Sequence, residues 1–275
     1  MRAVGIHLVQ DMRSETGAAR SAVAEIARDN RLSGVRMCGS DEEIEAAVGA
    51  DPALVLIDAP AVVPQVRGRR DPEHVLAWLD IPAFPVTPAR MAKVYGGTRG
   101  VPLAAALAAR GHVVAEALPD QVLRQLLWER AHPANSVPLD LGDYRAAWLD
   151  LRPPAFRPRG GRARNDGLAP ARALLEDATD LATWPASTRP GDLGDLDEAA
   201  AIDAVACAAL AWRCLHGAGD RWAVLGDAEA GRVVLAACPE MITRARTNIT
   251  RLAAEGTIGI GQAISGGDAG WPPKR

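Results

Sequence analysis

Alternation of apolar and polar residues predicts a β-strand at the beginning of the chain, over residues 2–9. Val4, Ile6 and Leu8 recur at every second position, which places them on one face of the strand. His7 therefore points to the opposite face. A histidine in a strand is more often a core residue with a hydrogen-bond partner than part of a site, and both interpretations of His7 stay open here.

The next segments predict a hairpin followed by a helix. Mixed apolar segments at 21–27 and 33–38 surround a turn-like Arg-Asp-Asn-Arg stretch, and a helix over 18–27 is the alternative to the first of these strands. Ser40 is then followed by three acidic residues, which is typical of a helix start. This helix is expected to end before Gly49.

Two continuous apolar runs predict strands that are buried on both faces. One run, at 54–60, is interrupted by Asp58 near its end, and the other, at 112–119, contains Glu116. A helix is predicted between them at 102–110. Strand, helix and strand in that order indicate a parallel crossover connection.

The second half of the chain is predicted to be mainly helical. Helices are expected at 121–130, 143–151, 169–182 and 196–216, and a hairpin at 222–225 and 232–236. Residues 1–237 would then form one α/β domain, with a loop-rich insertion around 82–100 and a mobile basic loop at 152–165. Residues 238–275 are interpreted as a partly flexible C-terminal appendage.

Composition changes this picture mainly by excluding classes of protein. The 275 residues are 48% hydrophobic and 24% charged, which excludes collagen, coiled-coil and wholly disordered chains. A net charge of -3 argues against a chain that coats nucleic acid through bulk charge, although a local basic patch stays possible. Four cysteines without a Cys-x-x-Cys pair, and a short apolar run at the start, predict a cytoplasmic protein with no membrane segment.

Three carboxylates fall within or at the end of apolar segments, where an unpaired buried charge would cost several kcal/mol. They are Asp58, Glu116 and Asp203. The carboxyl ends of parallel strands, where the first two lie, are the edge at which such sheets bind ligands. Three converging carboxylates would suit Mg²⁺ or Mn²⁺, whereas each acid alone could simply cap a helix or a strand end.

Several short motifs follow one another in a distinctive order over residues 1–237. They are Gly5-Ile6-His7, IDAP at 57–60, Arg67 with Arg70-Asp71, FPVTPAR at 84–90, Thr98-Arg99-Gly100, VVAEALP at 113–119, GRARNDGLAPARALL at 161–175, IDAVACAALA at 202–211 and VLGDAEAGRVVL at 224–235. In this order the chain resembles the domain-of-unknown-function family of predicted nucleases with the ribonuclease H-like fold.

The resemblance implies an α/β fold and a metal site. The expected mixed sheet has three antiparallel strands followed by parallel strands, and helices flank it. Asp58, Glu116 and Asp203 stand where the family has carboxylates that bind a divalent metal. His7 stands where the family usually has a further acid. A neutral imidazole ligates Mn²⁺ or Zn²⁺ but does not neutralise Mg²⁺ as a carboxylate does, so either metal preference or activity would change.

Candidate phosphate-binding residues are basic or lie in a glycine-rich loop. The loop at 96–100 precedes a predicted helix, so its N–H groups could bind an anion. The candidates are Arg67, Arg70, Thr98, Arg99, Arg162 and Arg164. Helix entry and solvated charge are the ordinary alternatives. The same loop also matches a nucleophile elbow with Thr98, but no motif places a histidine base beside it, which disfavours an acyl hydrolase.

Together, the acids and the resemblance predict a divalent-metal-dependent nuclease. It would hydrolyse phosphodiester bonds of nucleic acid or a nucleotide with Mg²⁺ or Mn²⁺, using Asp58, Glu116, Asp203 and His7. The alternative is a catalytically inactive module of the same fold that binds nucleic acid or a protein. His7 favours the second hypothesis, and the three retained acids favour the first.

Overall fold

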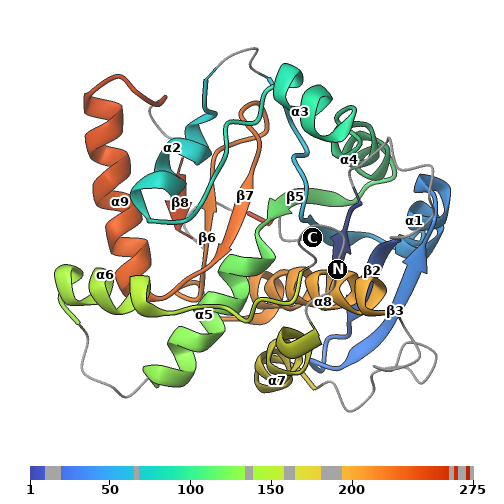
Figure 1. Ribbon diagram of the computed structural model, residues 1–275. Helices are drawn as coiled ribbons and strands as arrows, with labels where there is room; N and C mark the ends of the chain where they lie inside the picture. The colour runs from blue at the N-terminus through green and yellow to red at the C-terminus, as the bar shows by residue number, and fades with distance from the viewer. Residues whose placement is uncertain are drawn as a thin grey trace.

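A mixed sheet forms the centre of the protein in the computed structural model (Figure 1). The structure describes residues 1–9, 20–64, 68–133, 139–157, 165–180, 194–259, 263–265 and 271–272. Within these residues the strand order is β3-β2-β1-β4-β5-β7-β6-β8. The strands are β1 (Arg2–His7), β2 (Ser21–Ile26), β3 (Leu32–Cys38), β4 (Ala53–Ile57), β5 (Val113–Ala117), β6 (Trp222–Leu225), β7 (Val233–Ala236) and β8 (Ala263–Ser265).

The first five strands have the predicted pairing. β2 pairs antiparallel with both β1 and β3, whereas β4 is parallel to β1 and β5 is parallel to β4. This confirms the predicted α/β class, with three antiparallel strands followed by parallel ones and helices on both sides. The arrangement is compatible with a ribonuclease H-like fold.

Helices cover both faces of the sheet (Figure 1). Their bounds are α1 (Asp41–Val48), α2 (Asp71–Trp78), α3 (Pro88–Tyr95), α4 (Gly100–Ala109), α5 (Pro119–Ala131), α6 (Leu141–Asp150), α7 (Leu168–Ala178), α8 (Asp195–His216) and α9 (Pro239–Ala254). Helices α5, α7 and α8 share one core with the sheet, and α1 and α4 share a second core on the other face. A third core joins α2, α6 and α9 to β6 and β7.

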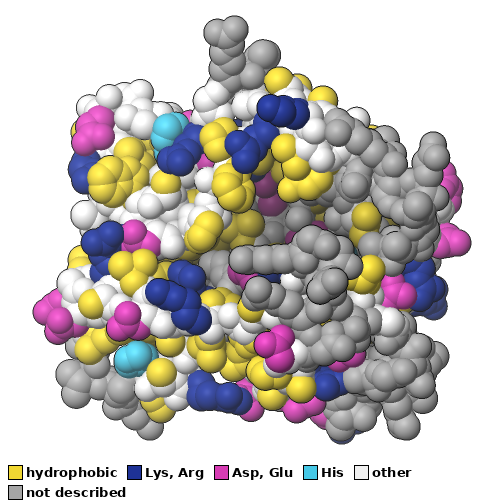
Figure 2. All heavy atoms as spheres, viewed as in Figure 1, with side chains coloured by type: hydrophobic (Ala, Val, Ile, Leu, Met, Phe, Trp, Pro, Cys, Tyr) yellow, Lys and Arg dark blue, Asp and Glu magenta, His cyan; other side chains and the backbone are white. Residues whose placement is uncertain are grey.

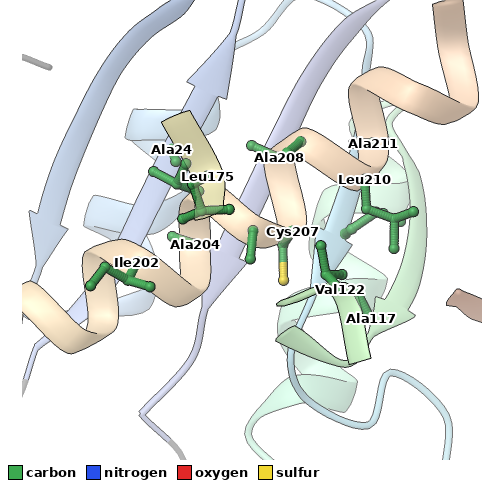
Figure 3. Packing of buried hydrophobic residues seen from close by; sticks show 14 of the residues in the cluster. Ala24, Ala117, Val122, Leu175, Ile202, Ala204, Cys207, Ala208, Leu210 and Ala211 are labelled. Atoms are coloured by element: carbon green, nitrogen blue, oxygen red, sulfur yellow. The ribbon is translucent and has the colours of Figure 1, made fainter. Parts of the chain in front are cut away.

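Helix α8 lies unusually close to β1 because small residues meet at their contact. A Cβ atom added at Gly5 would lie 2.1 Å from the carbonyl oxygen of Ala204 and 2.2 Å from the backbone nitrogen of Ala208. Figure 3 shows this alanine-rich side of α8 packed with Ala24 of β2. Residues 196–216 are long and apolar enough to cross a membrane by length and composition, but here they form a core helix buried on the sheet.

Several local predictions hold. The hairpin at β2 and β3 is confirmed, with Asn30 in the left-handed region at φ 66°, so the alternative helix over 18–27 is wrong. The hydroxyl of Ser40 accepts from the N–H of Glu43 and begins α1, which ends at Gly49. The insertion at 82–100 contains one short helix, α3, as expected.

The C-terminal part needs a correction, because residues 239–254 form α9 and are not an appendage. Met241, Ile242 and Leu252 of α9 are buried in the core that includes β6 and β7. β8 then adds a strand beside β6. Met241, Ile242, Ala245 and Leu252 recur at helical spacing, so the signal for this helix was present in the sequence. The folded domain therefore extends beyond residue 237.

Candidate functional site

His7, Asp58 and Asp203 converge at one edge of the sheet. His7 is the last residue of β1, and Asp58 directly follows the neighbouring parallel strand β4. Asp203 reaches them from α8, which covers this face. One ligand atom from each residue lies within 4.8 Å of the others, and no other histidine, cysteine or acid of the described chain forms such a group. The predicted convergence of Asp58 with Asp203, and the predicted direction of His7, are both realised.

Asp58 holds the end of β1 in place. Its Oδ1 atom accepts a hydrogen bond of 2.7 Å from the N–H of Leu8, and its Oδ2 atom lies 2.5 Å from Nδ1 of His7. The backbone N–H of Asp58 also donates to the carbonyl of Ile6, at 3.1 Å. Asp58 thus contacts the imidazole directly and fixes the backbone on either side of His7.

Asp203 is paired with an arginine that the sequence interpretation assigned to a mobile loop. Arg157 donates to both carboxylate oxygens of Asp203, with Nε at 2.7 Å from Oδ2 and Nη2 at 2.5 Å from Oδ1. It also pairs with Asp120 at the start of α5. The adjacent Phe156 is fully buried and anchors this part of the predicted basic loop 152–165 in the core. Packing therefore fixes Arg157 beside Asp203.

Opposite charges and burial together shift the pKa values of two groups in the site. Burial lowers the pKa of His7, but the charge and hydrogen bond of Asp58, with the charge of Asp203, outweigh burial and raise this pKa to about 9. Burial raises the pKa of Asp203, against the opposing effects of Arg157 and His7. At neutral pH two cations, on His7 and Arg157, therefore face the carboxylates of Asp58, Asp203 and Asp120.

Glu116 does not join this group, which corrects its predicted place among the metal ligands. Its two oxygens lie 2.6 Å and 2.8 Å from Nη1 and Nη2 of Arg70, and the N–H of Ala61 donates to it at 3.0 Å. Arg70 also pairs with Glu73 at 2.7 Å. All three side chains are buried, so the charge of Glu116 is already compensated within the fold.

The predicted phosphate-binding residues are placed elsewhere or fall outside the described part. Arg70 is 2% exposed and committed to Glu116 and Glu73. Arg99 pairs with Asp41 and donates to the carbonyl of Val9 at 2.7 Å, so it joins the N-terminal segment to α1 and α4. Neither arginine faces the acidic group as a free cation. Arg67, Arg162 and Arg164 lie outside the described residues.

Thr98 does not occupy a nucleophile elbow. Such an elbow follows a strand, whereas Thr98 follows helix α3 and lies in the turn before α4. Its carbonyl accepts from the N–H of Val101, and in the described chain no hydrogen bond joins its hydroxyl to a histidine. The acyl-hydrolase hypothesis therefore receives no support from the geometry.

The acidic group opens into a cavity of about 690 Å³. Its wall includes the acidic group, the beginning of α5, the segment 153–157, and Ile81, Pro82 and Tyr95. Hydrophobic and basic side chains lie next to each other near the middle of the face shown in Figure 2. Arg124 and Asp120 of α5 line this cavity and were not singled out in the sequence. Both residues lie in the first turns of the helix that follows β5, and this position could have identified them as candidates from the sequence.

Comparisons with protein-family models, with curated proteins and with solved structures find no match for this chain. The fold and the site therefore define its class on their own: an α/β protein with a mixed sheet and a buried His-Asp-Asp group that could hold a metal ion at the sheet edge.

Proposed function

We propose that this protein is a divalent-metal-dependent hydrolase of phosphodiester bonds. The observation that carries the proposal is the convergence of His7, Asp58 and Asp203 at the carboxyl ends of the parallel strands β1 and β4. The three residues line a cavity large enough for a small substrate. The order of motifs that resembles predicted nucleases of the ribonuclease H-like fold supports the same reaction class.

The donor set fits a divalent cation. Two carboxylates and one imidazole lie close enough to share a single ion, and mixed nitrogen and oxygen ligands suit Mn²⁺ better than Mg²⁺. A bound cation would activate water and stabilise the leaving oxygen of a phosphodiester. Glu116 is not part of this set, because Arg70 occupies its carboxylate.

The protein's own side chains set the conditions for binding a cation. Asp58 orients the imidazole of His7, and the raised pKa keeps a proton on that ring at neutral pH. Arg157 donates hydrogen bonds to both carboxylate oxygens of Asp203. A metal ion must therefore compete with the His7 proton and with the Arg157 guanidinium, so its binding releases a proton and becomes tighter as pH rises toward 9.

The test combines metal binding with cleavage. Native protein, Asp58→Asn and the exposed control Asp220→Asn are titrated with Mn²⁺ by calorimetry and assayed on labelled single-stranded and double-stranded DNA and RNA, in Mg²⁺ and in Mn²⁺. We expect cleavage by native protein and by Asp220→Asn. Asp58→Asn should bind Mn²⁺ at least about tenfold more weakly and lose cleavage. Absence of cleavage by the native protein with both metals would overturn the proposal for these substrates.

A second candidate function is a catalytically inactive binding module. The ion pair of Arg157 with Asp203 favours it, because a protein cation already takes the place where a metal would add charge. In this case the His-Asp-Asp-Arg group would be a structural element, and the cavity alone would bind a partner.

The Arg157→Ala variant separates the two functions. Without metal, the variant should lose about 3 kcal/mol of stability, because Asp203 is left as a buried carboxylate without its main partner. If the site holds metal, Mn²⁺ should restore much of this stability and bind the variant more tightly than native protein. Denaturant unfolding with and without Mn²⁺ measures both effects. Equal unfolding curves with and without Mn²⁺, for both proteins, would favour the binding module.

A further inference from the structure

Arg124 lines the same cavity as the acidic group and has no anionic partner among the described residues. Within the described chain no carboxylate makes a hydrogen bond or salt bridge with it. The other described arginine that lines the cavity, Arg157, is paired with Asp203 and Asp120. The guanidinium of Arg124 lies over the ring of Trp148, 5.5 Å from its centroid. Arg124 is therefore a half-buried cation whose donors are available to the cavity.

Burial and a neighbouring arginine act against the positive charge of Arg124. Burial and the charge of Arg152 both lower the pKa of Arg124. The charges of Asp120 and Asp80 raise it, but each of these acids forms a salt bridge with another arginine. The uncapped beginning of α5, at Leu118 and Pro119, also faces the cavity. A helix N-terminus and a guanidinium both attract an anion. A bound anion would therefore stabilise the partly buried positive charge of Arg124.

The rest of the cavity is suited to a planar or apolar group. Ile81, Pro82, Pro153 and Pro154 contribute apolar wall, and Tyr95, a residue that is 38% exposed, also lines the cavity. The volume of about 690 Å³ falls within the usual range for small-molecule sites. An exposed aromatic ring and an arginine without a described acidic partner, both lining one cavity, are the combination that stacks a base and holds its phosphate.

We propose that this cavity binds a phosphate ester the size of a mononucleotide, with an anchoring phosphate on Arg124 and the base against Tyr95. The proposal rests on the proposed function, since it names the substrate class of the same site. The ester is either a free nucleotide or the terminal nucleotide of a single strand. In both cases a phosphate on Arg124 would lie in the same cavity as the acidic group.

The experiment measures binding in EDTA, so that it does not depend on metal or cleavage. Native protein is titrated by calorimetry with adenosine 5′-monophosphate, adenosine and uridine 5′-monophosphate. A single-stranded octanucleotide with and without a 5′-phosphate distinguishes a chain end from a free nucleotide. The variants are Arg124→Ala and Arg124→Gln, and the matched control is Arg36→Ala, an exposed arginine on β3. Circular dichroism checks that each variant is folded, and Arg124→Gln replaces Arg124→Ala if the latter unfolds.

We expect native protein and Arg36→Ala to bind at least one of the two monophosphates, or the 5′-phosphorylated octanucleotide, about tenfold or more tightly than the form without phosphate. The Arg124 variants should lose this preference. Equal binding of phosphorylated and unphosphorylated forms by the native protein, or a preference that survives in the Arg124 variants, would overturn the proposal. Binding that depends on Arg124 without cleavage in Mn²⁺ would retain this inference and overturn the proposed function.

Discussion

At the scale of single residues, the composition of the site depends on which cationic side chain pairs with each acid. Acids within or at the end of apolar segments predicted a convergence of three carboxylates, of which Asp58 and Asp203 meet, and strand alternation predicted only that His7 points away from Val4 and Ile6. Glu116 satisfied the same pattern but pairs with Arg70. Sequence spacing could not show this pairing, because the two residues are 46 positions apart and meet only through the packing of β5 with the start of α2.

The His7–Asp58 contact predicts a dependence of stability on alkaline pH. The pKa of His7 is about 9 in the folded protein and about 6.5 in an unfolded chain. Because folding raises this pKa, the stabilisation is complete below pH 6.5 and is lost as pH rises through 9. The groups that face the ring are Asp58, Asp203 and Arg157.

Denaturant unfolding in EDTA at pH 7 and pH 10, for native protein and His7→Asn, measures this effect. We expect the native protein to lose about 3 kcal/mol more than the variant over this interval. An equal loss in both proteins would show that the His7 pKa is not raised by folding.

At the scale of elements, the contact of β1 with α8 determines where Asp203 lies. The alanine-rich pattern predicted α8 well, since small apolar residues on many sides indicate a buried helix. The close approach to β1 was not predictable, because it depends on Gly5 meeting the backbone at Ala204 and Ala208. Asp203 is one residue before this contact, so the same packing that buries the helix also delivers the carboxylate to His7.

Gly5→Ala should therefore disturb both stability and the site. The added methyl group would overlap the backbone of α8, and we expect a loss of about 3 kcal/mol or more in the free energy of unfolding. The matched control is Gly34→Ala on β3, where an added Cβ has no atom within 4 Å. Urea unfolding of the two variants is the measurement. A loss in Gly5→Ala no larger than in Gly34→Ala would contradict the tight packing.

At the scale of the whole molecule, the chain continues its sheet and core beyond the predicted boundary at 237. Sequence reasoning followed the first five strands correctly, since their apolar runs are long and their turns are clear. It stopped too early at the C-terminus, where α9 packs into the same core as one face of β6 and β7. Trp271, near the end, is also buried and packs against Trp222 of β6, with ring centroids 6.1 Å apart.

Removing residues 239–275 should accordingly unfold the protein or leave it aggregated. Truncation would expose the apolar side of β6 and β7 and discard at least four buried side chains of α9, at a cost of about 5 kcal/mol or more. Removing only residues 273–275 is the control. Thermal unfolding followed by circular dichroism compares the two shortened chains with the full one. Equal midpoints for the chain ending at 238 and the full chain would restore the boundary at 237.

The Arg70 network has a consequence for how loops around the cavity can change in length. Arg70 holds Glu116 of β5, Glu73 of α2 and the carbonyl of Val62, and Glu73 in turn accepts from the N–H of Val86. Three segments therefore meet at one guanidinium, and Val86 joins them through Glu73. An insertion between α2 and α3 can be accommodated only if Val86 keeps its place on Glu73. We expect insertions between residues 80 and 86 to displace Val86 from Glu73 and to lower the midpoint of thermal unfolding.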